Sequence, residues 1–211
     1  GGPGAVRGLD VRTGARRWIF HLIPRPGELG HDTWPADAWK TATGVMPWSG
    51  QSLDEKRGIV YIATKTAEPD FYGAERHGKN LFANSLVALD ATTGKRLWHF
   101  QMVHHGVWDY DLPAAPTLVD LVVDGRAIKA VAQITKQGYT YVFDRLTGEP
   151  VWPIIETPVP QSTVPGEKLS PTQPIPTKPP AFELQGVSDE TLVDFTPDLR
   201  QEAERLIEQF D

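Results

Sequence analysis

Short apolar runs separated by turn-forming residues dominate most of the chain. The runs at residues 58–64 (GIVYIAT) and 138–144 (GYTYVFD) are rich in β-branched and aromatic side chains. Residues 116–135 form two further apolar runs joined by Asp124 and Gly125, a dipeptide typical of tight hairpin turns. These patterns predict an all-β fold built from many short strands.

One strand–turn–Trp pattern recurs along the chain. It is LDVRTGARRW at residues 9–18, LDATTGKRLW at residues 89–98 and FDRLTGEPVW at residues 143–152, each with Asp, Thr-Gly and Trp at the same spacing. We expect an apolar strand to end at the Asp, and the Gly to take a positive φ in a tight turn. The returning strand then carries a Trp whose large indole packs against a neighbouring unit.

Such a repeat favours a β-propeller over a β-sandwich, because sandwich strands seldom carry an identical turn and Trp. We therefore assign residues 1–152 to a partial β-propeller. The opening GGPGAVRGLDV runs almost directly into strand-like sequence. The chain is accordingly expected to be a piece cut from a longer protein.

The character of the chain changes after residue 152. Residues 153–187 are rich in proline, which predicts an extended segment lying over a neighbouring surface, with a disordered linker as the alternative. Residues 188–211 are predicted to contain a helix with Thr196 as N-cap and Pro197 as its first residue. Its apolar face, which needs a partner surface, would comprise Leu199, Ala203, Leu206, Ile207 and Phe210.

Composition narrows the function classes. The 211 residues carry a formal net charge of −6, which argues against nucleic acid or an anionic membrane surface as partner. The absence of cysteine from these residues excludes disulfides and thiolate metal sites within them. No apolar run approaches the roughly 20 residues of a membrane span.

The stretch QMVHHGVWDYDLPAAP, residues 101–116, gathers the chemistry-bearing residues. Asp109 sits in a predicted loop beside bulky groups, where a carboxylate can act as a general base, as a ligand of a hard cation, or simply as a turn cap. His104 and His105 are adjacent, so on a strand they would point to opposite faces and would not chelate one metal easily. We expect one of them to be an orienting hydrogen-bond partner.

Two further residues can contact a ligand. Lys136 lies between two strand-like runs, where its ammonium either points at a ligand oxygen or is an ordinary exposed charge. Trp48 is flanked by Pro and Gly, so its indole is either a core plug or a flat stacking platform. GxSxG, P-loop and GxGxxG motifs are all missing from the sequence. These residues alone indicate a propeller with a polar pocket.

The Trp repeat and the ordered series DTWPADAWK, SLDEKRGIVYIAT, VWDYDLPAAP, QITKQGYTYVFDR and SPTQPIPTKPPAF resemble the dehydrogenases that depend on pyrroloquinoline quinone (PQQ). The resemblance is to their glucose-dehydrogenase-like branch and covers nearly all of the chain. It implies an eight-bladed β-propeller of which this chain supplies a central part, about three blades. It also implies oxidation of a sugar or alcohol hydroxyl, with hydride transfer to the quinone.

The resemblance assigns roles residue by residue. Asp109 matches the base, Lys136 matches the basic residue that hydrogen-bonds the quinone oxygens, and Trp48 matches the residue on which PQQ stacks. His105 is added to the cofactor site as the orienting histidine. Calcium or another hard cation would be held by Asp109 and Thr66, with Glu68 compensating, because Thr66 stands where alcohol-oxidising members have an asparagine.

The resemblance also implies the wider setting. Members work in the periplasm or on the periplasmic face of the membrane, and electrons leave through a quinone or another acceptor by way of the parent protein. Other metal and cofactor ligands would lie outside this chain, so the piece alone is expected to be inactive, and its exposed blade edges could self-associate. The alternative, from a different class, is a non-catalytic β-propeller that binds a protein or glycan.

Overall fold

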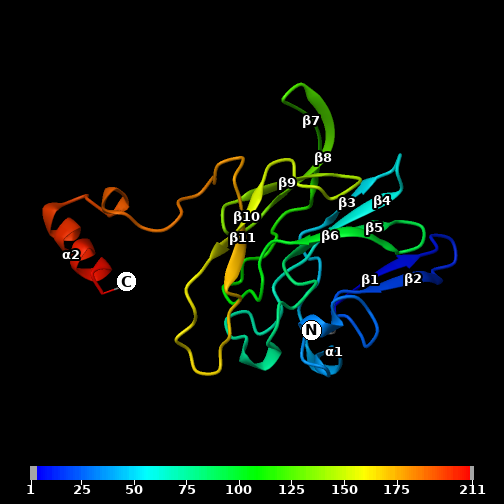
Figure 1. The fold of residues 1–211 in the computed structure, drawn as a ribbon, viewed down its shortest axis with the longest axis horizontal. Coiled ribbons are helices and arrows are strands. Elements are labelled where there is room, and N and C mark those ends of the chain that lie inside the picture. Colours follow the sequence, from blue (N-terminus) through cyan, green and yellow to red (C-terminus); the bar gives the residue numbers. More distant parts are fainter. Residues whose placement is uncertain (1–3, 210–211) are drawn as a thin grey trace.

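The computed structural model describes residues 4–209 and consists mainly of short antiparallel strands (Figure 1). The strands are β1 (Ala5–Leu9), β2 (Arg16–His21), β3 (Gln51–Asp54), β4 (Ile59–Ala63), β5 (Ser85–Asp90), β6 (Arg96–Gln101), β7 (Thr117–Val123), β8 (Arg126–Ile134), β9 (Thr140–Asp144), β10 (Ile154–Pro158) and β11 (Thr172–Pro176). The helices are η1 (His31–Thr33), α1 (Ala38–Thr41), η2 (Ala74–Arg76), η3 (Asp189–Thr191) and α2 (Pro197–Ile207). The predicted all-β class is confirmed.

The strands form four separate sheets. Strands β3-β4-β5-β6 make a four-stranded meander and β7-β8-β9 a three-stranded one, while β1-β2 and β10-β11 are two-stranded. Strands β7 and β8 are joined at Asp124 and Gly125, both with positive φ, as the sequence predicts. None of the four sheets closes on itself.

The central meander is buried on both faces. Ile62 and Val87 point into a core shared with the β1-β2 sheet, whereas Tyr61 and Leu86 point into a core shared with the β7-β8-β9 sheet. Because alternate residues of a strand face opposite sides, β4 and β5 carry apolar side chains at nearly every position. The sheets thus stack face to face around the meander, as neighbouring propeller blades do.

Each repeat tryptophan in the first two units contacts the turn of the next unit. The indole Nε1 of Trp18 donates to Ala91 O at 3.0 Å, and that of Trp98 donates to Arg145 O at 3.2 Å. A Cβ built on Gly94 would lie 2.5 Å from the Trp18 ring, and one on Gly148 would lie 2.6 Å from the Trp98 ring. The glycine is therefore needed for close approach of the indole as well as for its positive φ.

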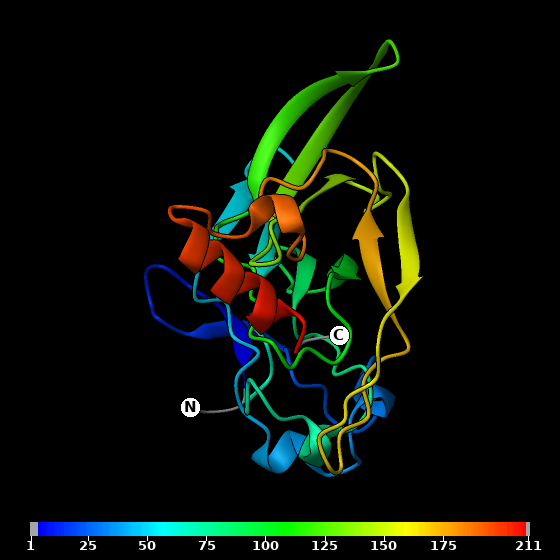
Figure 2. The same cartoon turned by 90° about the vertical axis from the view of Figure 1, so that its left-hand side faces the viewer.

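After Trp152 the chain forms the hairpin β10-β11, drawn in yellow and orange at the right of Figure 2, and then leads to helix α2, drawn in red in front of the sheets. The Pro-rich segment contains strands β10 and β11, which pair with each other as an antiparallel hairpin. Helix α2 has Thr196 as its N-cap, with Oγ1 accepting from Leu199 N at 3.2 Å, as the sequence predicts. None of its described residues is buried, and the predicted face residue Phe210 lies outside the described residues. No helix within residues 4–209 has the length and apolar character to cross a bilayer.

Candidate active site

The loop that carries Asp109, residues 103–112 (hereafter the WDYD loop), connects β6 to the segment before β7. It turns sharply, with positive φ at His105 (48°) and Asp109 (53°). Two buried side chains fix its backbone: Arg76 Nη2 donates to Gly106 O at 2.8 Å, and Asn84 Nδ2 donates to Tyr110 O at 3.0 Å. The position of Asp109 is thus set by contacts from residues far away in the sequence.

Lys136 lies between the two aspartates of the loop. Its Nζ donates to Asp109 Oδ2 at 2.8 Å and to Asp111 Oδ2 at 3.2 Å, while its backbone N donates to Asp111 O at 3.0 Å. Partial burial acts to lower the pKa of Lys136, but the hydrogen bonds to the two carboxylates outweigh it and raise the pKa above 10.5. The ammonium is therefore charged at every physiological pH.

Asp111 joins the parts of the site. It is 4% exposed, and its carboxylate accepts from Thr66 N at 2.8 Å and from Trp48 Nε1 at 3.0 Å in addition to Lys136. These donors come from three segments of the chain: Thr66 follows Trp48 by 18 positions, and Lys136 follows Thr66 by 70. A buried carboxylate with three donors is held firmly in place.

Trp48 presents its indole outward. The side chain is anchored at Nε1 by Asp111, yet the residue is 51% exposed, and Lys136 Nζ lies 5.7 Å from the ring centroid. Of the two possibilities left open by the sequence, a core plug and a stacking platform, this exposure favours the platform. An anchored, half-exposed indole beside a cation fits a flat anionic ring system such as PQQ.

Thr66 and Glu68 lie close to the site in different ways. Thr66 is fully buried, and its Oγ1 accepts from Asn84 Nδ2 at 2.9 Å. Both carboxylate oxygens of Glu68 are engaged, one by Thr43 Oγ1 at 2.6 Å and the other by Lys65 Nζ at 3.1 Å. Within the described part of the chain, no group of three or more His, Cys, Asp or Glu side chains is arranged to hold a metal ion.

Asn84 is a site residue that the sequence analysis did not single out. Its side-chain Oδ1 is buried and has no hydrogen-bond partner among residues 4–209, while its Nδ2 binds both Thr66 and Tyr110. A buried amide oxygen without a donor is the type of group that binds a hard cation or an ordered water. The positive φ of Asn84 (48°) is the only local peculiarity, and it is not visible in the sequence.

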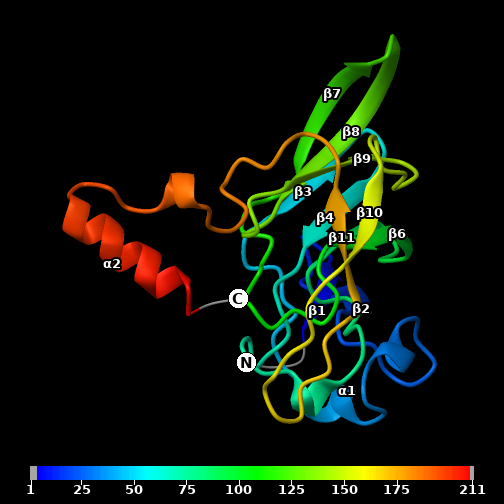
Figure 3. The same ribbon diagram turned by 60° about the vertical axis from the view of Figure 1, so that its left-hand side comes forward.

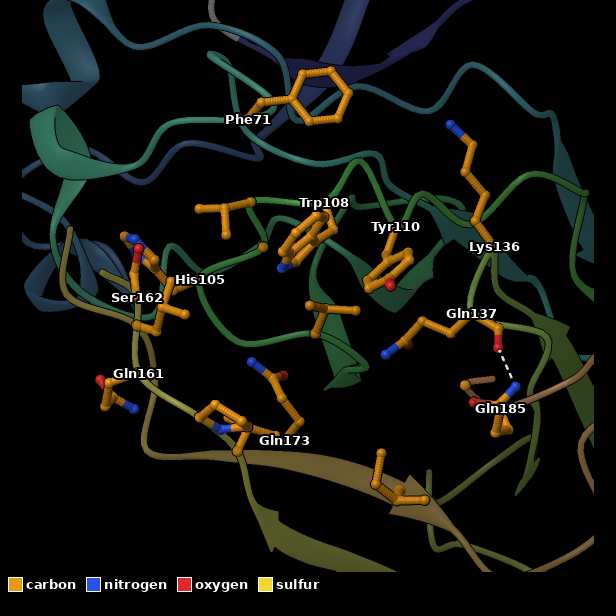
Figure 4. Close-up of a pocket in the computed structure, with 18 of the residues that line it drawn as sticks. Phe71, His105, Trp108, Tyr110, Lys136, Gln137, Gln161, Ser162, Gln173 and Gln185 are labelled. Atoms are coloured by element: carbon orange, nitrogen blue, oxygen red, sulfur yellow. Dashed lines mark hydrogen bonds between the residues drawn. The ribbon is translucent and has the colours of Figure 1, made fainter. Parts of the chain in front are cut away.

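A cavity of about 800 Å³ opens beside the WDYD loop (Figure 4). Trp108 and Tyr110 lie at its middle, Lys136 and Gln137 on one side, and His105 on the opposite side next to Ser162. His105 is 3% exposed; its Nδ1 lies 2.7 Å from Gly78 O and its Nε2 lies 4.0 Å from Glu167 Oε2. Asp109, Lys136 and Trp48 thus lie together around Asp111, whereas His105 lies in the opposite cavity wall.

Comparison with known proteins gives consistent results. The family model described as "PQQ: Glucose/ethanol/alcohol dehydrogenase, beta-propeller domain" matches residues 1–211. Among curated proteins, the chain is 39% identical over 173 residues to the quinoprotein glucose dehydrogenase of Escherichia coli, covering 81% of this chain and 21% of that protein. It is 35% identical over 196 residues to the quinate/shikimate dehydrogenase (quinone) of Acinetobacter baylyi, covering 92% of this chain and 24% of that protein.

Among solved structures, the quinohemoprotein alcohol dehydrogenase of Pseudomonas putida superimposes with a TM-score of 0.68 at 31% identity, covering 83% of this chain and 27% of that one. The chain thus spans between a fifth and a quarter of the length of these curated relatives. The match over all of its residues, together with the stacked sheets and their docked tryptophans, shows that this chain belongs to the β-propeller family of PQQ-dependent glucose, ethanol and alcohol dehydrogenases.

Proposed function

We propose that this chain supplies the catalytic base and one face of the cofactor site of a PQQ-dependent dehydrogenase that oxidises a sugar or alcohol hydroxyl. The observation that carries the proposal is the convergence of Asp109, Lys136 and Trp48, joined through Asp111. A propeller that served only as a scaffold has no need for a carboxylate, an ammonium and an exposed indole at one point.

Each side chain has a defined task. Asp109 is partly exposed, so a substrate hydroxyl can reach its carboxylate, which removes the hydroxyl proton. Lys136 orients the Asp109 carboxylate through a hydrogen bond of 2.8 Å. Trp48 would support the flat cofactor on its exposed indole, and PQQ, when bound, would supply the acceptor for the hydride that leaves the substrate carbon.

The metal part of the proposal rests on oxygen donors. Asp109 would contribute a carboxylate oxygen to calcium or another hard cation, and the hydroxyl of Thr66 and the unpartnered Oδ1 of Asn84 are further oxygens nearby. Glu68 is a weaker candidate than the sequence suggests, because both of its oxygens already accept hydrogen bonds. The remaining ligands are proposed to come from other parts of the protein.

The substrate, acceptor and location are proposed from the relatives. Those compared are dehydrogenases of glucose, of quinate and shikimate, and of glycerol. A polyhydroxylated substrate is therefore proposed, with a quinone as eventual electron acceptor and the periplasm, or the periplasmic face of the membrane, as location. His105 is proposed to act behind the site, because its ring is buried in the far wall of the cavity.

A titration tests the proposal. PQQ is added with calcium to the full-length protein, and quenching of tryptophan fluorescence is followed for the wild type and for Asp109→Asn, Lys136→Ala and Glu149→Gln. Glu149 lies on an exposed turn and serves as the control. We expect Asp109→Asn to bind PQQ but to lose dye-linked sugar or alcohol oxidation, Lys136→Ala to bind weakly, and Glu149→Gln to match the wild type. A wild-type protein that binds no PQQ would instead indicate the alternative, a non-catalytic propeller.

A further inference from the structure

The two adjacent histidines both contact the Pro-rich arm, defined here as residues 153–177, which contains β10 and β11 (Figure 3). His104 contacts its strands: the backbone N donates to Gln173 Oε1 at 2.8 Å, Gln173 Nε2 donates to His104 O at 2.7 Å, and the ring Nε2 lies 3.0 Å from Glu156 Oε1. His105 faces the tip of the arm through Glu167. The two adjacent histidines thus contact the arm at two different points, His104 at its strands and His105 at its tip.

Glu167 inserts a carboxylate into the protein interior. Its side chain is 3% exposed; Oε1 accepts from the backbone N of Gly73, while Oε2 lies 4.0 Å from His105 Nε2. A Cβ built on Gly73 would lie 2.3 Å from that same Nε2, so the three residues are in tight contact. Neither Oε2 of Glu167 nor Nε2 of His105 has a hydrogen-bond partner in the described part of the chain.

The charges around His105 explain why these two atoms remain apart. The ring Nδ1 must donate to Gly78 O, because a carbonyl only accepts. Burial lowers the pKa of His105, and the cations Arg76 and, when protonated, His77 act in the same direction, while Glu167 opposes them. The neutral ring therefore turns a bare nitrogen toward the carboxylate, and His105 does not neutralise Glu167.

Arg76 lies on the other side of Gly73, and its backbone N donates to Gly73 O at 3.0 Å. Its guanidinium is buried, and it donates to three uncharged acceptors: Asn80 Oδ1 at 2.8 Å, Pro69 O at 2.9 Å and Gly106 O at 2.8 Å. Burial lowers the pKa of Arg76 to about 10, and the nearby charge of Glu167 opposes that shift. Because Gly73 binds Glu167 and Gly106 belongs to the WDYD loop, Gly73 and Arg76 together connect the tip of the arm with the loop that carries Asp109.

Few other contacts hold the tip of the arm. Tyr72 donates its hydroxyl to Pro165 O at 3.2 Å, and His77 Nε2 donates to Gly166 O at 2.8 Å, both in exposed positions. Residues 159–164 and 166 are largely exposed, yet residues 159–164, 167 and 169 line the cavity beside Lys136. Among the described residues, the tip of the arm therefore depends on one buried carboxylate and two surface hydrogen bonds, whereas its strands are held by His104 and by Tyr141, whose hydroxyl donates to Pro174 O at 2.8 Å.

We propose that Glu167 is a positioning residue that docks the Pro-rich arm as a wall of the cavity and, through its contacts with Gly73 and His105, fixes the WDYD loop. Docking of the arm and ordering of the loop that carries Asp109 are then one coupled event. The inference rests on the proposed function only for what the cavity binds. The conformational claim concerns the chain's own residues and is tested without PQQ.

Hydrogen exchange followed by mass spectrometry on the cofactor-free full-length protein tests the coupling. Glu167→Ala should exchange at least about tenfold faster than the wild type both in residues 159–171 and in residues 103–111, since the amide of Gly73 loses its buried acceptor and the packing of Glu167 against His105 is lost. Glu149→Gln, which removes an exposed charge, should match the wild type in both segments. Should Glu167→Ala fail to fold, Glu167→Gln keeps the acceptor for Gly73 and removes only the charge, and it should speed exchange in both segments at least about threefold.

A covalent tether gives the rescue. A Cβ built on Gly166 would lie 3.2 Å from the Cβ of Ala74, slightly less than the roughly 3.5–4.5 Å in disulfides, so a small shift of the exposed tip would allow the bond. These 211 residues contain no cysteine. The substitutions Ala74→Cys and Gly166→Cys are added to the Glu167→Ala variant. Because Gly166 has a positive φ, replacing it can itself disturb the arm, so the oxidised protein is compared with its own reduced form. Oxidation should return exchange in both segments to within about twofold of the wild type.

The exchange measurements distinguish docking of the arm from its coupling to the WDYD loop. Unchanged exchange in residues 159–171 of the Glu167 variants would show that the arm is held by other contacts and would overturn the proposal. Faster exchange in the arm but not in residues 103–111, or a tether that restores only the arm, would overturn the coupling to Asp109. Either result leaves the PQQ titration unaffected, so failure of this inference is distinguishable from failure of the proposed function.

Discussion

The two aspartates of the WDYD loop should respond to mutation in opposite ways, although both bind Lys136. Asp109 is partly exposed, and its carboxylate has one protein partner, Lys136. Asp111 is buried and accepts from Thr66, Trp48 and Lys136. We therefore predict that Asp111 supports the fold of the site, whereas Asp109 performs its chemistry.

The loss in free energy of unfolding follows from the hydrogen-bond donors that each substitution leaves without an acceptor. Asp111→Ala leaves the amide of the fully buried Thr66 without an acceptor, which costs about 1–3 kcal/mol. Lost bonds to the indole of Trp48 and to Lys136 add about 0.5–1 kcal/mol each, because both donors can turn to solvent or to Asp109. The sum lies between about 2 and 5 kcal/mol, with a middle value of about 3–4 kcal/mol. For Asp109→Ala the loss stays under about 1 kcal/mol, as for other partly exposed ion pairs.

Urea unfolding monitored by circular dichroism measures both variants. With a slope of about 2–3 kcal/mol per molar urea, Asp111→Ala should lower the midpoint by about 1–2 M, and Asp109→Ala should shift it by less than about 0.5 M. Asp111→Asn, whose Oδ1 can still accept from Thr66 N, should lower the midpoint less than Asp111→Ala, because only the bonds to Trp48 and Lys136 are lost. Equal midpoints for the Asp109 and Asp111 variants would refute the reasoning.

Three further predictions follow from the fold and its charges. Gly148→Ala should destabilise the chain by about 1–3 kcal/mol more than Gly14→Ala in thermal unfolding, because both glycines have positive φ but only Gly148 is covered by an indole. Lys136 has a raised pKa, so its contribution to stability is present below pH 10.5 and is lost only as pH rises through the folded pKa. The difference between the unfolding midpoints of the wild type and Lys136→Met should therefore stay constant between about pH 7 and 9. Burial lowers the pKa of His105, so its contribution to the stability of the fold is fully present above pH 6.5 and is lost as pH falls through the lowered folded pKa; the urea midpoint of the wild type should fall more between about pH 7.5 and pH 5 than that of His105→Gln.

Local patterns allowed the strands, the turns and the docked tryptophans to be predicted from the sequence. Each depends on residues within about ten positions of one another, such as Asp90, Gly94 and Trp98. The indole of Trp98 also shows why the repeat is informative: its partner, the turn at Gly148, carries the same signature. Convergence of Asp109, Lys136 and Trp48 was anticipated from family resemblance, since no local pattern reports contacts over that distance.

Pairing of β10 with β11 was not predicted, because the prolines of this segment argue against a strand. The structure shows how it tolerates them. Thr177 N donates to Pro153 O at 3.0 Å and Val159 N donates to Pro171 O at 3.1 Å, which brackets the hairpin. Hydrogen-bonded pairs alternate with non-bonded ones from these ends, so Pro158, Pro174 and Pro176 all fall at positions that need no amide donor. The spacing of the prolines would have revealed the register only to a reader who already knew the partner strand.

The residues that sequence analysis missed share one property, which is that each works on a segment distant from its own. Asn84 binds Tyr110, and Arg76 binds Gly106, so two buried polar side chains before β5 hold the loop after β6. Such residues carry no signature, because buried polar groups are specified by the partners that they satisfy and not by their neighbours in sequence. The meander makes this possible, since its two apolar faces fix β4, β5 and β6 without these polar contacts. The loop that bears Asp109 is anchored at its ends by the buried Val103 and Leu112, and between them its shape depends on charges and hydrogen bonds. Small changes in those contacts can therefore alter the chemistry while the fold remains intact.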